Sequence, residues 1–527
     1  MKTRNIILGI ALMVGVSACS KKDFEDNYTD PSKIGTTTVE KQYSGFLQSN
    51  WDYVVPNYWN YFVILRTSLQ HYNQTVGWAN GANQYVTGAA SITDRWKSYY
   101  GSLAQYKELL KVYNASTADD QELRRIYYIT ATIYLYDHTQ RTIDLHGDIP
   151  FTGAGLLSTN GGNYAQSYAP YDDAAAIYTK MLDDLKAFST ELNTIQPIAA
   201  IQSSFKTQDF INGGNIATWA KYCNSLRLRM LTRVSAASAF SSRASSEIAE
   251  ILGSPATYPV VTTNADNILM DVKDLNTQIN AKGFRDGLES WNGNAAGKKM
   301  IDFLVSNADP RLPVMFETTV ANPAIYVGVD PMGLSNEQQL DMDNGRISLY
   351  NRSTFSRNQY FPGVLMTASE VNLLAAEYYV KTGDNAKAKA AYETAIRQST
   401  EFYYSVRALS NDGTVDAPAT PTEGQITTYL ASPGASWDLA TTNDTKLNLI
   451  ATQKWLHFNV IQPYELYAEV RRLDKPSFTF QVDNANSLKQ PPTRWQYPAE
   501  EATYNNANYS TVQSKDIPTG KLFWDVN

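Results

Sequence analysis

The sequence predicts a mainly α-helical protein built from stacked helical hairpins, with an irregular, loop-rich region packed over them. Three observations support this fold class. Residues 365–399 contain two apolar helix faces in succession, separated by Gly383-Asp384. Residues 219–234 keep their apolar side chains on one helix face throughout. Between about 255 and 362 the helical period is lost, because Gly, Asn, Asp and Pro interrupt short apolar runs.

The stretch 365–399 has the pattern of a tetratricopeptide helical hairpin. Its first half spaces apolar residues from Val371 to Tyr378 as i, i+3, i+4 and i+7, which marks one face of a helix. Gly383 tolerates the left-handed turn that ends a helix, and Asp384 can cap the next one. The hairpin spacing is matched by Ala376, Gly383, Ala388, Tyr392 and Ala395. An ordinary antiparallel helix pair is the alternative, and either interpretation gives a helical core.

The remaining elements are predicted in chain order within one α-helical domain, residues 39–527. The aromatic cluster up to Leu69 is expected to be helical and to face the core. A breaker-rich turn is expected at 144–151, and irregular insertions at about 255–362 and 400–445, which a helical scaffold would use for binding. Further helices are predicted at 96–112, 123–136, 171–185, 219–234, 446–459 and 463–473.

The N-terminus is typical of an exported lipoprotein. Residues 1–18 have two basic residues, an apolar run too short to span a bilayer and small residues before Cys19, as in a lipoprotein signal peptide. We therefore expect lipidation at Cys19, an acyl chain as the membrane anchor, and a tether over residues 19–38. An uncleaved anchor or plain secretion is the alternative.

Composition excludes several functional classes. A net charge of −7 argues against nucleic acid, whose phosphates require a basic surface. With Cys19 used for lipidation, Cys223 cannot form an internal disulfide, and its apolar helix suggests a small core residue. Nearby Arg227, Arg229 and Arg233 are expected to form ion pairs rather than a phosphate site.

No catalytic or metal-binding motif is found, so neither a catalytic residue nor a cofactor is expected. The histidines His71, His138, His146 and His457 lack metal-ligand spacing. The run 341–345 begins like a calcium loop, but its Gly comes one residue early and Arg352 stands where the closing Glu belongs.

Two predicted loops combine aromatic rings with amides, the side chains that bind the apolar faces and hydroxyls of sugars. Peptides would use similar rings with less stereochemical precision. Each aromatic could instead pack beneath its own loop. The candidate ligand-binding residues are Tyr72, Asn73, Trp78, Asn80, Asn83 and Tyr85 in the first loop, and Trp291 and Asn292 in the second.

Several short motifs occur in order along the chain. They are Gly147–Phe151, Trp219–Arg229, Asp309–Leu312, Met366–Glu377, Gln453–Trp455, Tyr464–Arg472 and Arg494–Pro498 with Glu501 and Asn505. Taken in this order, they resemble the SusD/RagB family of nutrient-binding outer-membrane lipoproteins. The acidic stretch 23–26 after Cys19 also resembles the surface-export signal of Bacteroidetes lipoproteins.

The resemblance implies tetratricopeptide-like hairpins, a ligand-facing irregular half and a location on the outer membrane, facing the outside of the cell. It also implies a partner, a SusC-like TonB-dependent transporter on which such proteins form a hinged lid. The sequence lacks a clean match to the sugar-stacking residues of starch-binding members, so the ligand could be an oligosaccharide or an oligopeptide. A surface glycan-degrading enzyme and a purely protein-binding adaptor remain the alternative functions.

Overall fold

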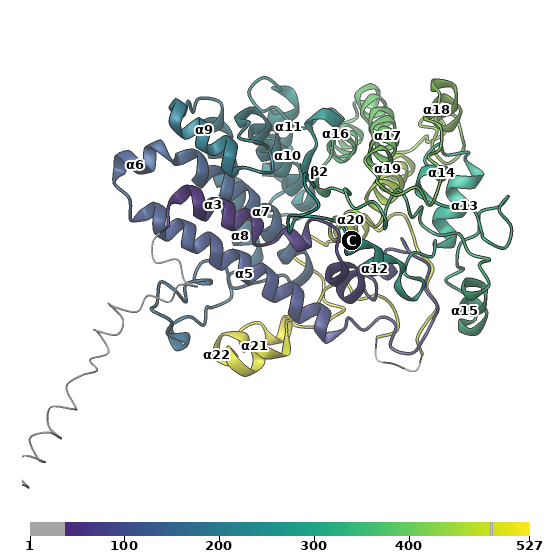
Figure 1. Cartoon of the computed structure of the whole chain (residues 1–527), viewed down its shortest axis with the longest axis horizontal. Coiled ribbons are helices and arrows are strands. Elements are labelled where there is room, and N and C mark those ends of the chain that lie inside the picture. The colour runs from purple at the N-terminus through teal and green to yellow at the C-terminus, as the bar shows by residue number, and fades with distance from the viewer. Residues whose placement is uncertain (1–36, 485, 487) are drawn as a thin grey trace, which may run out of the picture.

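The computed structural model describes residues 37–484, 486 and 488–527, and the fold is mainly helical as predicted (Figure 1). The predicted signal peptide, Cys19 and most of the tether lie outside the described residues. The longer helices are α3 Val39–Gln48, α5 Ala89–Asn114, α7 Arg125–His146, α8 Ala174–Leu192, α9 Ala199–Gln208, α10 Ile216–Val234, α11 Ser241–Gly253, α13 Lys298–Ser306, α15 Ser335–Asp343, α16 Ala368–Thr382, α17 Asn385–Ala408, α18 Glu423–Leu430, α19 Asn443–Phe458 and α20 Pro463–Leu473.

Short elements fill the connections between these helices. The strands β1 Ile268–Met270 and β2 Gly363–Met366 pair antiparallel. The short helices are α4 Leu69–Tyr72, α6 Ala118–Leu123, α12 Phe284–Glu289, α14 Leu312–Met315, α21 Ala499–Tyr504 and α22 Asn506–Tyr509. The 3₁₀ turns are η1 Trp51–Tyr53, η3 Tyr164–Gln166, η4 Asn264–Asp266, η5 Ser290–Asn292 and η6 Gln513–Lys515. The element η2, Trp59–Leu65, is a π-helix.

The long helices pack as a continuous stack. Helix α3 lies against α5 and α7, α8 against α10, and α10 against α11 and α16. Helix α16 then packs on α17 and α19, and α19 on α20. In Figure 1 these helices extend across the molecule, whereas α21 and α22 lie at its lower edge. Each hairpin buries its apolar face on a neighbour, as a solenoid requires.

The predicted hairpin at 365–399 is confirmed as α16 and α17. The Thr367 hydroxyl caps α16 by accepting from the Glu370 amide. Gly383 ends it with a φ of 83°, and Asp384 caps α17 by accepting from the Lys387 amide. Ala376, Ala388, Tyr392 and Ala395 are buried in a shared core with Trp437 and Leu449. The small side chains allow the two helices to approach closely.

Several predicted boundaries differ from the structure. Helix α7 continues to His146, so the predicted turn begins three residues later, at Gly147, whose φ is 83°. The helix continues because Asp144 is buried there, bonded to the Arg233 guanidinium and the Tyr178 hydroxyl. Helix α17 likewise runs to Ala408, into the stretch predicted as irregular from residue 400.

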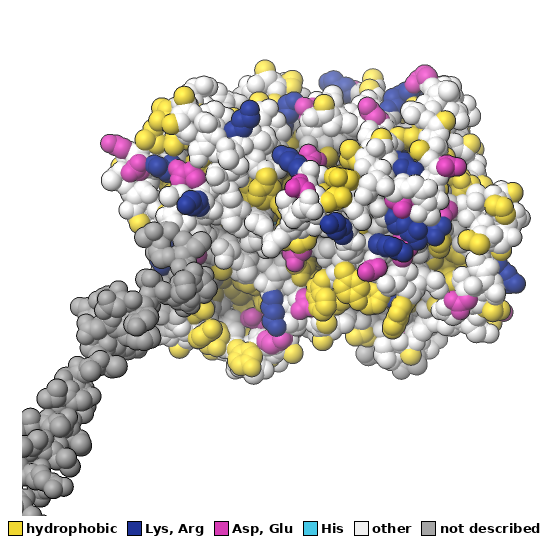
Figure 2. Space-filling view, in the orientation of Figure 1, with side chains coloured by type: hydrophobic (Ala, Val, Ile, Leu, Met, Phe, Trp, Pro, Cys, Tyr) yellow, Lys and Arg dark blue, Asp and Glu magenta, His cyan; other side chains and the backbone are white. Residues whose placement is uncertain are grey.

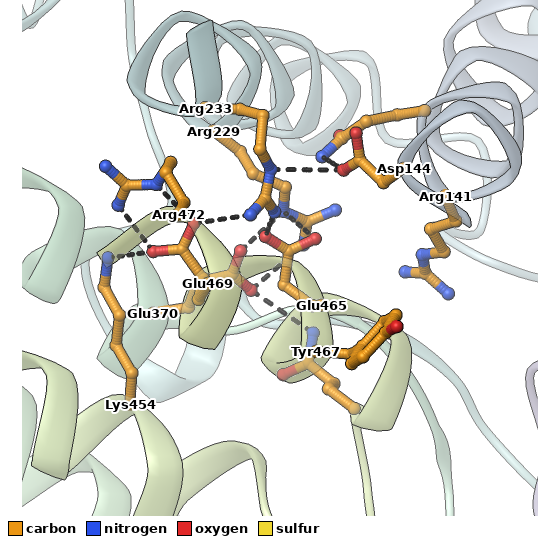
Figure 3. Close-up of polar contacts among 12 residues, drawn as sticks. Arg141, Asp144, Arg229, Arg233, Glu370, Lys454, Glu465, Tyr467, Glu469 and Arg472 are labelled. Atoms are coloured by element: carbon orange, nitrogen blue, oxygen red, sulfur yellow. Dashed lines mark hydrogen bonds and ion pairs between the residues drawn. The ribbon is translucent and has the colours of Figure 1, made fainter. Parts of the chain in front are cut away.

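A buried ionic network fastens five helices together (Figure 3). From α10, Arg229 reaches Asp137 of α7 at 2.9 Å and Glu370 of α16 at 2.5 Å. Arg233 pairs with Asp144 of α7 and with Glu465 and Glu469 of α20. Lys454 of α19 and Arg472 of α20 both bind Glu377 of α16, at 2.9 and 2.7 Å.

The network confirms the predicted ion-pairing role of the arginines on α10. Arg227 pairs with Glu247 of α11 at 2.7 Å. Burial alone would raise the pKa of Glu377, but Arg472, Lys381 and Lys454 hold it well below its ordinary value.

Cys223 on α10 is buried, and burial raises its pKa to about 12, which suits a core residue. Among the described residues, no helix has both the length and the apolar character to cross a bilayer.

Candidate functional site

Exposed aromatic side chains gather where η2 meets the turn after α12. Figure 2 shows hydrophobic side chains exposed on this face, in the neighbourhood of α12. Trp291, in η5, is 80 % exposed, and Tyr58 at the start of η2 is 40 % exposed. We define the aromatic platform as Tyr58, Phe62, Arg66, Trp78 and Trp291.

The π-helix η2 supplies one side of the platform. Tyr58, Phe62 and Arg66 are spaced four residues apart and therefore follow one another along one face of the helix. The rings of Tyr58 and Phe62 are stacked, with centroids 5.2 Å apart and planes at 15°. The Trp291 ring meets Phe62 edge-on at 6.0 Å and 88°. The stacked rings of Tyr58 and Phe62 and the edge-on ring of Trp291 therefore border the same surface.

Arg66 joins the two loops that were predicted to bind ligand. Its guanidinium carbon lies 5.2 Å from the Phe62 ring, 5.6 Å from Trp291 and 5.8 Å from Trp78. Its Nη2 also donates to the Trp291 carbonyl at 2.8 Å. A guanidinium is attracted to the face of an aromatic ring, so these contacts favour ring orientations that turn a face toward Arg66. One side chain therefore orients two tryptophans that lie more than two hundred residues apart in the sequence.

Trp291 is held in a conformation that its side chain disfavours. Its φ and ψ are 55° and 43°, the left-handed region, which is strained for a residue with a β-carbon. Asn292 follows at a φ of 58° and donates to the Asp343 carboxylate at 3.3 Å. Such strain persists where the surroundings enforce it, often at binding sites. Here it turns a large ring out to solvent.

Ionic contacts anchor the base of this turn. Glu289 ends α12 and accepts from Arg357 through both oxygens, at 2.9 Å each, and from the Ser356 hydroxyl at 2.6 Å. Burial would raise the pKa of Glu289, but these bonds lower it below its ordinary value. The carboxylate is therefore ionised near neutral pH and fixes the residue two positions before Trp291.

Two glycines let α12 lie directly on η2. A β-carbon at Gly287 would be 2.8 Å from the Asn57 carbonyl oxygen and 3.0 Å from the Tyr61 β-carbon. One at Gly283 would be 2.9 Å from the Tyr58 amide nitrogen. The two contacts with backbone atoms, at 2.8 and 2.9 Å, are too short for a methyl group. The position of Trp291 relative to Tyr58 and Phe62 therefore depends on the absence of side chains here.

The variant Gly287→Ala is expected to lose about 1–3 kcal/mol of unfolding free energy, because the new methyl forces α12 away from η2. Urea denaturation measures this loss. Gly101→Ala in α5 is the matched control, since nothing lies within 4 Å of its added β-carbon. That control should gain up to about 1 kcal/mol, as an exposed helical Gly→Ala change does. Equal behaviour of the two variants would contradict the close-packing argument.

Beside the platform, Trp78 lines a small hollow of about 20 Å³ with Asn80, Lys298 and Pro331. His71 is stacked between the Trp78 ring at 4.7 Å and the Tyr85 ring at 5.5 Å. Burial lowers the His71 pKa to about 3, so the imidazole is neutral at physiological pH. The Trp78 indole N–H is buried without a partner in the described structure, which leaves a donor in the wall of this hollow.

The structure places four of the eight predicted ligand residues in the interior. The Tyr72 hydroxyl donates to the Tyr85 carbonyl at 3.1 Å, and the Tyr85 hydroxyl to the Gln481 carbonyl at 2.5 Å. The Asn73 amide donates to the Pro463 carbonyl at 3.2 Å. The Asn80 amide donates to the carbonyls of Pro331 and Gly333. These side chains are buried and donate hydrogen bonds to other parts of the chain, so the expectation that they lie in open loops is corrected.

The other four candidates keep accessible surface. Trp78 and Trp291 meet at Arg66, and Asn292 follows Trp291. Asn83 is exposed at a φ of 60°, and its backbone amide donates to Asp483 at 2.8 Å. Ligand contact by these residues stays a prediction.

Sequence reasoning missed the η2 side of the platform. The cluster up to Leu69 was expected to be helical and to face the core, and Tyr61, Ile64 and Leu65 do. Tyr58 and Trp59, however, are 40 % and 48 % exposed. The four-residue spacing of Tyr58, Phe62 and Arg66 was the available signal, because it puts two rings and a cation on one face.

The platform suits a partly apolar ligand. Its rings offer flat apolar surfaces, and the Asn292 amide offers a polar contact at the edge. Over the described part of the chain, no group of three or more His, Cys, Asp or Glu is placed to hold a metal ion. The calcium-like run at 341–345 lies at the end of helix α15.

The sequence matches the SusD-like family, described as "Starch-binding associating with outer membrane", over residues 36–498. No curated protein matches it significantly.

Solved structures of SusD-like proteins have a similar fold. A Bacteroidetes SusD-like protein shares 21% identity over 93% of this chain and 100% of its own, with a TM-score of 0.73. An outer membrane protein of Bacteroides vulgatus shares 19% over 93% and 100%, with a TM-score of 0.72. A chitin-binding SusD homologue of Flavobacterium johnsoniae shares 20% over 92% and 99%, with a TM-score of 0.68.

Proposed function

This chain belongs to the SusD-like family of nutrient-binding outer-membrane proteins, and we propose that it binds oligosaccharides through the aromatic platform. The observation that carries the proposal is Trp291, which is 80 % exposed in a strained backbone conformation between Arg66 and Phe62. Exposing a large ring costs hydrophobic burial, and holding it at positive φ costs conformational energy. We infer that Trp291 is retained despite both costs because its ring binds ligand.

Carbohydrate is the favoured ligand class. Pyranose rings have apolar C–H faces that stack on flat aromatic rings, and the platform offers the stacked pair Tyr58–Phe62 and the free Trp291 ring. The starch-binding description of the family and the chitin-binding homologue support the same class. An oligopeptide is the second candidate, because its side chains can use the same rings.

The proposal extends to location and partner. The small residues before Cys19 and the acidic residues after it support a lipoprotein anchored in the outer membrane and facing outward. Family membership supports a SusC-like TonB-dependent transporter as the partner, with this chain as the lid that delivers nutrient. A stiff helical stack with its ligand surface on one side is suited to hinge closure.

Calorimetric titration of the protein truncated after Cys19 tests this function. The probes are maltoheptaose, chitohexaose and a mixed oligopeptide pool. We expect saturable binding of at least one oligosaccharide and no shortening of it during incubation. If only the peptides bind with saturation, the ligand is a peptide and not a carbohydrate. Shortened oligosaccharide products would favour the glycan-degrading enzyme, which needs paired carboxylates about 5–9.5 Å apart. Transporter capture without any affinity for the probes would favour the protein-binding adaptor.

A further inference from the structure

A second hollow lies beside helix α5, away from Trp291. Its volume is about 190 Å³. Its walls come from α5, from the connection 150–169 and from α21 with Asn505. We call it the α5 hollow. Figure 2 shows exposed hydrophobic side chains around α21 and α22 as well as near α12.

Aromatic rings line the α5 hollow. Tyr168 and Tyr504, at its mouth, are 44 % and 65 % exposed. Trp96 and Tyr100 lie deeper, with ring centroids 4.8 Å apart. Two exposed tyrosines on facing elements are costly unless they cover something, because each leaves a large apolar ring in water. The Ala169 carbonyl also accepts from the Asn505 amide at 3.1 Å, which ties the two walls together.

A fixed carboxylate supplies the polar contact. Glu501 accepts from the Trp96 indole at 3.3 Å, from the Tyr171 hydroxyl at 2.8 Å and from the Asn505 amide at 3.0 Å. These bonds set its orientation and leave lone-pair capacity on Oε1, since a carboxylate has about four acceptor positions. A hydroxyl group entering the hollow would meet an acceptor already in place.

The charges at the hollow select against anions. Two carboxylates, Glu500 and Glu501, line the hollow, and Glu500 pairs with Lys97, which lies 3.7 Å away and is 67 % exposed. A sulfated or uronic-acid sugar would therefore be repelled. Flat rings, a fixed acceptor and negative charge together fit a neutral, hydroxyl-rich ligand.

Helix α5 separates this hollow from the aromatic platform. Trp59, next to Tyr58, is 48 % exposed and donates to Asp94 of α5 at 2.9 Å. The adjacent Thr93 donates to Glu500 at 3.3 Å. Since a helix with its side chains is about 10–12 Å across, only an oligomer could touch both places.

We propose that the α5 hollow is a second binding site for neutral sugar units, and that one oligosaccharide chain runs from the platform past Trp59 into it. This proposal rests on the proposed function and specifies its substrate as an oligomer long enough to cross α5. Two linked contacts raise affinity through effective concentration. Long neutral oligosaccharides therefore bind more tightly than disaccharides, and the difference depends on the hollow.

Fluorine NMR of protein labelled with 5-fluorotryptophan tests the two sites separately. The Trp96 and Trp291 signals are assigned with the variants Trp96→Phe and Trp291→Phe. Maltoheptaose and chitohexaose are the long probes, and maltose and chitobiose the short ones. We expect the long oligomer that binds to shift both signals along the same saturation curve, and oligogalacturonate to leave Trp96 unshifted. A Trp96 response to oligogalacturonate would overturn the assignment to neutral sugars.

The double variant Tyr168→Ala/Tyr504→Ala is expected to lose about tenfold or more in affinity for the long oligomer and to keep its affinity for the disaccharide at Trp291. Both side chains are exposed, so the fold is retained, which circular dichroism checks. Tyr164→Ala is the control, because Tyr164 is 67 % exposed on the same connection and does not line the hollow.

The outcomes separate the two proposals. If Trp291 shifts and saturates while Trp96 does not respond, or if the double variant binds the long oligomer like the parent protein, the second site is overturned and the proposed function stands. If Trp96 responds and Trp291 does not, the platform loses its assigned role and the bridging chain is overturned. If neither signal responds to any glycan, both proposals fail.

Discussion

Replacing Arg233 with Met is expected to lower the free energy of unfolding by about 3–5 kcal/mol. Arg233 is fully buried, lies 3.1 Å from Asp144 and 2.7 Å from Glu469, and also pairs with Glu465. Its guanidinium carbon lies 5.3 Å from the Trp524 ring. Met fills similar space without charge, so the main effect is on the carboxylates that lose their cation.

The physical reason is the uncompensated charge that remains. Taking a carboxylate out of water costs several kcal/mol, and in the network this cost is offset by the paired guanidinium. Without Arg233, Glu465 and Glu469 of α20 and Asp144 of α7 must share fewer cations or take up protons. Either response weakens the contact between α20, α7 and α10.

Urea denaturation at low temperature measures the loss, which is a large part of the stability of an ordinary domain. Arg346→Met is the matched control. Arg346 pairs with Asp341, but their side chains are 57 % and 43 % exposed. A pair so exposed contributes at most about 1 kcal/mol. If the two variants lose the same stability, the buried network does not hold the stack together.

The helical scaffold was predictable because its signals are local. Apolar periodicity and the Gly383-Asp384 break identified α16 and α17, and the arginines of α10 were correctly assigned to ion pairs. The partners of those arginines were beyond sequence reasoning. Arg233 meets Glu469 across 236 positions, and no spacing rule connects residues so far apart.

The candidate site was only partly predictable, for the same reason. The two amide-rich and aromatic stretches identified from the sequence lie together in the fold, since both supply a tryptophan to Arg66. Burial within them depends on distant acceptors. Asn73 is buried because its amide reaches the Pro463 carbonyl, 390 positions away. A polar residue in a Gly-containing stretch therefore looks exposed in the sequence until its partner is known.

Removing the Trp291 ring is expected to weaken oligosaccharide binding by about 10- to 100-fold, the range of a strong aromatic contact. Both Trp291→Ala and Trp291→Gly remove the ring, so their affinities should fall together. Calorimetric titration with the oligosaccharide that binds the parent protein measures the change. Tyr164→Ala removes another largely exposed ring, outside the platform, and should leave affinity unchanged.

The same two variants should differ in stability. At a φ of 55° a β-carbon is strained, whereas Gly adopts this conformation freely. Trp291→Gly is therefore expected to exceed Trp291→Ala by about 1 kcal/mol in unfolding free energy, measured by urea denaturation. If both variants lose binding and Trp291→Gly is the more stable of the two, the parent protein retains a strained Trp291 because its ring binds the ligand. Unchanged affinity in both variants would mean that the ligand does not bind at the platform.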